Sequence, residues 1–67
     1  MTKRKPDLLV HGGGSLYMLR PVSRRGSRWI ADNIADDATR FGGAVAVEHR
    51  FILDVVRGAV SDGLRVR

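Results

Sequence analysis

The 67-residue chain contains no cysteine and only two histidines. Disulfide bridges and thiolate metal sites are therefore excluded, and two histidines alone do not supply the ligands of a metal centre. We expect neither a metal nor a cofactor. The lack of cysteine is compatible with a reducing cytoplasm, where we expect the protein to act.

Long apolar runs are also lacking, since a run such as Ala44–Val47 is far shorter than the roughly 20 residues of a membrane span. The basic residues Lys3, Arg4 and Lys5 precede only three consecutive apolar residues, which is too few for a signal peptide. We expect a soluble protein with no membrane partner. A domain this small buries only about 60% of its unfolded surface, so a partner subunit would add needed stability.

Acidic residues are scarce near the start of the chain. The first 28 residues contain seven of the twelve cations and a single acid, Asp7, which gives a local charge of +6. Residues 29–67 contain five arginines and six acids, so the overall charge of +5 comes from one end of the chain. A one-sided cationic field raises the rate of encounter with polyanions and acidic protein surfaces. The charge pattern therefore predicts a binding partner rather than a reaction.

The N-terminal segment combines basic residues, Pro6 and the triplet Gly12–Gly14. This composition predicts a flexible basic arm over residues 1–14, followed by one domain over residues 15–67. In that domain, Leu16–Leu19 has high strand propensity and is closed by Pro21.

A helix is predicted to begin at Ser23, which is a good N-cap residue. Behind it, the apolar stripe Ile30, Ile34, Ala38 and Phe41 has helical spacing, and glycines at 42 and 43 are expected to end the helix after a bend near Ala35.

A second strand is predicted over Ala44–Glu48, and a second helix follows, because the apolar residues of 51–60 form one broad helical face before Gly63. Leu64 and Val66 alternate with arginines and predict a terminal strand. The order β-α-β-α-β predicts a small α+β domain, a two-layer sandwich with two helices on one face of a three-stranded sheet. The pattern leaves the strand order open, and a homodimer could form through an exposed sheet edge.

Three short motifs suggest catalysis, but each has a simpler interpretation. His11–Gly14 matches an oxyanion-hole tetrapeptide of esterases, yet the sequence contains no nucleophile elbow to accompany it. Glu48 and His49 are adjacent, so on a strand their side chains would point to opposite faces. Asp36 and Asp37 fit a helix cap better than a metal site. We find no catalytic residues and expect the protein not to be an enzyme.

The strongest candidate binding site is a cluster of arginines. Three of them fall within one turn of the first predicted helix and a fourth leads into it, which predicts one convergent surface. Guanidinium groups bind phosphates and carboxylates through paired hydrogen bonds, so the cluster suits a nucleic-acid backbone or an acidic protein patch. A solubilising basic surface is the alternative, although cations in a first helical turn oppose the helix dipole. The cluster consists of Arg20, Arg24, Arg25 and Arg28.

Two further features could assist binding. Lys3, Arg4 and Lys5 would lie on the predicted arm, where their charges promote encounter without a fixed geometry. Tyr17 could stack on a nucleic-acid base near the cluster, whereas packing against Trp29 in the core is the simpler interpretation. The strand predicted between the two helices argues against a helix-turn-helix.

One pattern spans about four fifths of the chain and consists of Gly14–Tyr17, Leu19, Pro21, Trp29, Phe41–Gly42, Val47–Arg50 and Asp62–Leu64. In this pattern the chain resembles small accessory proteins of bacterial phages, plasmids and prophages, some of which are anti-CRISPR proteins. The resemblance implies an inhibitor that docks on a larger protein or ribonucleoprotein complex, such as a CRISPR effector complex, and blocks nucleic-acid binding. The alternative hypothesis is direct nucleic-acid binding through the arm and the arginine cluster.

Overall fold

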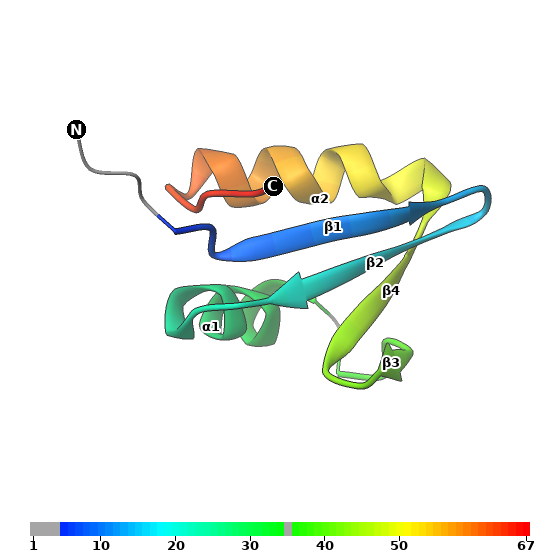
Figure 1. Ribbon diagram of the computed structural model, residues 1–67, viewed down its shortest axis with the longest axis horizontal. Helices are drawn as coiled ribbons and strands as arrows, with labels where there is room; N and C mark the ends of the chain where they lie inside the picture. Colours follow the sequence, from blue (N-terminus) through cyan, green and yellow to red (C-terminus); the bar gives the residue numbers. More distant parts are fainter. Residues whose placement is uncertain (1–4, 35) are drawn as a thin grey trace.

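The computed structural model of the chain describes residues 5–34 and 36–67. It confirms a small α+β domain with two helices, but the sheet has four strands rather than the three expected (Figure 1). In chain order the elements are β1 (Leu8–Gly13), β2 (Leu16–Pro21), α1 (Arg24–Asn33), β3 (Arg40–Phe41), β4 (Ala44–Glu48) and α2 (His49–Ser61). The sheet order is β1-β2-β4-β3, and all neighbouring strands are antiparallel.

The expectation of a flexible arm over residues 1–14 is wrong for β1, which pairs with β2 along its whole length. The two strands are joined by Gly14 and Ser15, and Gly14 has φ 67°. Two-residue hairpin turns favour glycine in this conformation, so this part of the glycine triplet makes a turn rather than a linker. The folded domain therefore begins before residue 15. Lys3 and Arg4 lie outside the described residues, and Lys5 is exposed just before β1.

Helix α1 begins as predicted but ends earlier. The Ser23 side chain accepts a hydrogen bond from the backbone N–H of Gly26 at 3.0 Å, which confirms the N-cap. The helix ends at Asn33, because Ile34 has extended dihedral angles. Phe41 instead belongs to β3, and Gly42 and Gly43 form its hairpin turn to β4, both with positive φ. The bend expected near Ala35 lies outside the described residues.

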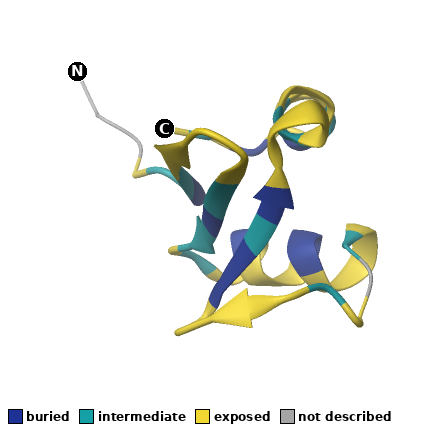
Figure 2. Ribbon diagram, turned by 90° about the vertical axis from the view of Figure 1, so that its right-hand side faces the viewer, coloured by how far each residue is buried: buried dark blue, intermediate teal, exposed yellow. Residues whose placement is uncertain are grey.

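Both helices cover the same face of the sheet, as expected. Leu8, Leu19, Val45 and Val47 point to one face by strand alternation and register, and all four belong to the buried core. Figure 2 shows the helices on one side of the sheet. The helices and the C-terminal segment complete this core with Trp29, Ile30, Ala59 and Leu64.

Helix α2 confirms the second predicted helix, but the predicted terminal strand is reduced to a short pairing beside β1. A single parallel bridge joins Leu8 to Val66. Four backbone hydrogen bonds form this contact, from Asp7 N–H to Arg65 O at 2.8 Å, from Leu8 N–H to Arg65 O at 3.1 Å, from Val10 N–H to Arg67 O at 2.8 Å and from Arg67 N–H to Leu8 O at 3.0 Å. The C-terminal segment therefore covers the outer edge of β1 over residues 8–10.

Candidate functional site

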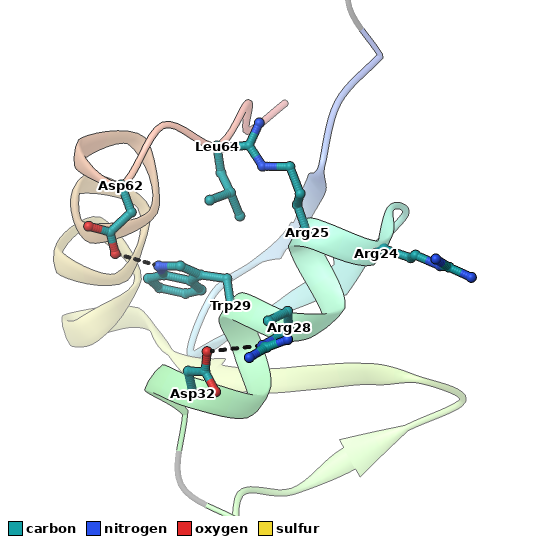
Figure 3. A pocket seen from close by; sticks show the side chains of 7 residues that line it. All are labelled: Arg24, Arg25, Arg28, Trp29, Asp32, Asp62 and Leu64. Atoms are coloured by element: carbon teal, nitrogen blue, oxygen red, sulfur yellow. Dashed lines mark hydrogen bonds and ion pairs between the residues drawn. The ribbon is translucent and has the colours of Figure 1, made fainter.

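Arg24, Arg25 and Arg28 lie on the exposed side of α1, and we call these three residues the α1 arginine face. They line an open pocket of about 440 Å³ (Figure 3). Arg20 does not line this pocket, so three of the four predicted arginines come together. The other lining residues are Trp29, Asp32, Asp62 and Leu64.

The α1 arginine face is positioned by Asp7, which is 8% exposed. One carboxylate oxygen of Asp7 accepts the Ser23 hydroxyl proton at 2.7 Å, and the other accepts the backbone N–H of Arg65 at 2.9 Å. Gly26 lies directly against the backbone of Asp7, where an added Cβ would overlap the carbonyl oxygen. The inner side of the first turn of α1 is therefore fixed at close range, and the arginines at 24 and 25 are left on the outer side.

The floor of the pocket is apolar and is held by a polar link between the two helices. Trp29 Nε1 donates a 2.7 Å hydrogen bond to Asp62 Oδ2 at the end of α2. Trp29 is 9% exposed and Leu64 beside it is 7% exposed. The ring and the leucine side chain thus form the apolar part of the pocket that the arginines line (Figure 3).

The arginines of this face differ in how they are engaged. Arg28 Nε lies 3.7 Å from Asp32 Oδ2, but both side chains are largely exposed, so the ion pair contributes little to stability. Arg25 donates to the backbone oxygen of Gly63 at 3.2 Å. Arg24 points away from the other side chains of the pocket, and no ion pair holds it within the described residues (Figure 3). The first turn of α1 contains no acidic residue, and Asp32, one turn beyond Arg28, pairs only with Arg28 among the described residues.

Arg20 and Tyr17 lie elsewhere, which the sequence analysis did not anticipate. Arg20 points to the sheet face opposite the helices, because Leu19 beside it is in the core, and its guanidinium donates to Gly42 O at 2.9 Å. Tyr17 lies toward the other end of β2, where its ring stacks on His49 with 6.3 Å between the centroids. Tyr17 and the arginines therefore do not share a surface on which one nucleic acid could stack and bind, as the sequence had suggested.

The role of Asp7 in positioning the site was not predicted from the sequence. Asp7 is the only acid among the first 28 residues, and that isolation within a basic segment is the signal that could have identified it. Asp32, Asp62 and Leu64 were likewise not recognised as pocket residues, because their proximity to the arginines depends on how α1 packs against the end of α2.

The residues of the three remaining motifs do not line this pocket. The turn of the β1–β2 hairpin contributes Gly14 to an open groove that also contains Glu48, His49 and Arg50. Across residues 5–34 and 36–67, no three His, Asp or Glu side chains are grouped so that they could hold a metal ion. Neither described helix is long and apolar enough to cross a membrane.

Comparison with known proteins gives no relative. No protein-family model, no curated protein and no solved structure matches the chain. Its function must therefore be inferred from the site itself.

Proposed function

We propose that the protein is a non-enzymatic binding protein whose α1 arginine face docks on an acidic surface of a larger protein or nucleoprotein complex. The observation that carries this proposal is the concentration of three exposed guanidinium groups on one helical turn that contains no acid. Such groups bind carboxylates through paired hydrogen bonds and speed encounter with an anionic partner.

The two carboxylates of the pocket favour a protein surface over a nucleic-acid backbone. Asp32 and Asp62 line the same pocket as the arginines, so a uniformly anionic ligand would meet repulsion there. A protein surface can place its own acids against the arginines and its own cations against these aspartates. Direct nucleic-acid binding is the less supported alternative for this reason.

The apolar floor of the pocket supports a partner that inserts a side chain. Trp29 and Leu64 line the same pocket as the arginines, and binding energy at protein interfaces concentrates where an apolar anchor enters a pocket with a polar rim. The partner surface would therefore combine acidic residues with one projecting apolar residue.

The resemblance to mobile-element proteins suggests the first partner to test. An inhibitor such as an anti-CRISPR protein acts by occupying a surface of the effector complex and so blocks nucleic-acid binding. Under this proposal the α1 arginine face would make that contact, and the partner would be a CRISPR effector complex of a bacterial host.

The test is an interaction assay with purified effector complexes, in which the wild-type chain is compared with the variant R24E/R25E/R28E. We expect binding by the wild type and loss of binding by the variant. The matched control is R40E/R50E/R57E, which makes the same charge change at three exposed arginines outside the pocket and should retain binding. Equal loss in both variants would mean that net charge, and not the α1 arginine face, determines docking.

A gel-shift titration separates the alternative. Direct nucleic-acid binding requires a steep dependence of affinity on salt and an affinity above the weak limit of roughly 10⁻⁴ M for non-specific binding. We expect no specific shift with bare DNA or RNA. A tight, salt-sensitive shift that the R24E/R25E/R28E variant abolishes would support the alternative instead.

A further inference from the structure

The outer edge of β4 is covered over only part of its length. β3 consists of two residues and pairs with the first two residues of β4, so it lies beside only the first part of that strand (Figure 1). One further bond runs from Ala46 N–H to Thr39 O at 2.9 Å. Among residues 5–34 and 36–67, no strand pairs with Val47 or Glu48 on this side. A short stretch of strand edge therefore lies open between β3 and the start of α2.

The open edge offers one hydrogen-bond acceptor and one donor. In an antiparallel strand the N–H and C=O of one residue point to the same side, and successive residues alternate. Ala46 donates outward to Thr39, and His49 donates to the opposite side, to Ser15 O at 2.9 Å. The Ala46 carbonyl and the Glu48 N–H therefore both point outward, and no backbone group of the described residues bonds to either. Such unpaired edge groups are a template for another strand.

An apolar groove of about 400 Å³ opens beside this edge. It lies between the end of α1, the start of α2 and β4, and its apolar lining includes Ile34, Ala38, Val45, Val47, Phe51 and Val55.

The wall that α2 contributes to this groove is partly open to solvent. Phe51 is 47% exposed, and the Arg50 guanidinium carbon lies 4.9 Å from the centroid of its ring. Val47 belongs to the buried core and lines the groove from the sheet. The groove is therefore an extension of the core that reaches the strand edge at the point where β4 loses its partner.

We propose that an extended peptide segment of a partner protein adds to the sheet along this edge of β4. Its backbone bonds to the Ala46 carbonyl and the Glu48 N–H. Residues directly opposite each other on neighbouring strands share one face of the sheet, so the peptide residue opposite Val47 directs its side chain into the groove. A large aliphatic or aromatic residue at that position supplies the specificity, while the backbone bonds fix the segment, as in other cases of strand addition.

The size of the open edge selects this occupant. Two residues of strand are only about 7 Å long, and the edge is bounded by β3 on one side and by the start of α2 on the other. The edge of a second folded copy would bring its own turns and helices against these elements, whereas a single extended segment can pass between them. A nucleic acid lacks the alternating N–H and C=O groups that match the edge.

This site is separate from the α1 arginine face. The groove uses the end of α1 and the start of α2, whereas the arginine pocket uses the first turns of α1 and residues after the end of α2. No residue lines both. The strand-addition site can therefore hold a partner segment whether or not the arginines dock on an acidic surface.

The test is an NMR titration of the full chain with a capped seven-residue peptide of threonines around one central leucine. We expect the Glu48 amide and the Phe51 ring signals to shift. A matched peptide with central alanine should bind at least roughly tenfold more weakly, because it buries less apolar surface. The leucine peptide with its three central amides N-methylated should not bind, since it cannot donate to the edge. Equal binding of the methylated peptide would overturn the proposal.

A variant of the protein removes the donor of the edge. Glu48 has φ −61°, which is the value that proline fixes, and its N–H points away from β2. Glu48→Pro should therefore keep the wild-type circular dichroism spectrum and bind the leucine peptide roughly tenfold more weakly. Glu48→Ala is the matched control, because it removes the same carboxylate and keeps the N–H, and it should bind as the wild type does. Equal binding by the two variants would contradict strand addition.

A second pair of variants tests the groove. Phe51→Ala removes part of the wall and should bring the affinity for the leucine peptide close to that for the alanine peptide. Leu53→Ala, at a 57% exposed position outside the groove, should leave both affinities unchanged. The proposal fails if no peptide shifts the Glu48 and Phe51 signals. It also fails if these signals shift with protein concentration alone, which would identify a second copy as the occupant. None of these variants alters the α1 arginine face, so docking on a partner complex is tested separately.

Discussion

The carboxylate of Asp7 accepts a 2.7 Å hydrogen bond from the hydroxyl of Ser23, and this contact joins the start of β1 to the N-cap of α1. The same hydroxyl oxygen accepts a hydrogen bond from the backbone N–H of Gly26, so Ser23 links the helix cap to the buried acid. The other carboxylate oxygen reaches Arg65. One side chain thus connects the beginning of the sheet, the first helix and the C-terminal segment.

Replacement of Asp7 by alanine should lower the stability markedly. The change leaves the Ser23 hydroxyl and the Arg65 N–H without their acceptor, and lost hydrogen bonds to a buried charged group cost about 1.5 to 3 kcal/mol each. Urea denaturation followed by circular dichroism measures the loss. Asp37→Ala, which removes an exposed acid, serves as the control and should change little. Equal stability of the two variants would contradict the role given to Asp7.

Gly26→Ala should destabilise the protein although alanine is the better helix former. The added Cβ would overlap the backbone oxygen of Asp7, and overpacking of this kind costs about 1 to 3 kcal/mol. The contrast is Gly58→Ala in α2, where the new Cβ would lie 3.6 Å from the Trp29 ring, an ordinary contact. That variant should gain about 0.5 to 1 kcal/mol from helix propensity. Thermal unfolding of both variants should therefore shift in opposite directions.

Asp62→Ala should loosen the junction between the two helices. It removes the acceptor of the Trp29 indole N–H, and an unsatisfied buried donor costs about 1 to 3 kcal/mol. Trp29 is the only tryptophan, so tryptophan fluorescence reports on this site alone. We expect the emission spectrum of the folded variant to differ from that of the folded wild type. An unchanged emission spectrum together with unchanged stability would show that the hydrogen bond is not formed in solution.

Asp32→Asn should leave stability within about 0.5 kcal/mol of the wild type, because the ion pair it removes is exposed. It should nevertheless raise the weak affinity for nucleic acid, since one of the two carboxylates that oppose phosphates in the pocket loses its charge. A gel shift at low salt checks this result. No change in that shift would mean that the pocket carboxylates do not discriminate against polyanions.

Local sequence patterns predicted those parts of the helices for which the pattern fits only one kind of structure. The broad apolar face of residues 51–60 and the stop near Gly63 correspond to α2, and Ser23 caps α1 as expected. The pair Gly42–Gly43 led to a wrong prediction, because two glycines can either end a helix or form the turn of a β-hairpin. Phe41 was assigned to the helix for this reason, although it pairs with Ala44 in the sheet.

The arginine site was predictable in part. Arg24, Arg25 and Arg28 share a helical turn, so their proximity follows from local geometry alone. Arg20 lies apart from them, because Leu19 points into the core and the next residue of the strand therefore points to the other face of the sheet. The pocket's aspartates and Leu64 required the packing of α1 against the end of α2, which no local pattern contains.

The pairing of β1 with the C-terminal segment has a consequence for the order of folding. The hydrogen bond between Asp7 and Arg65 spans 58 positions, so it can form only after a long loop has closed. The β1–β2 hairpin is local and can form early, but α1 gains its full anchorage only in the final closure. A chain interrupted before residue 65 would carry all three arginines and still lack the fixed surface on which they act together.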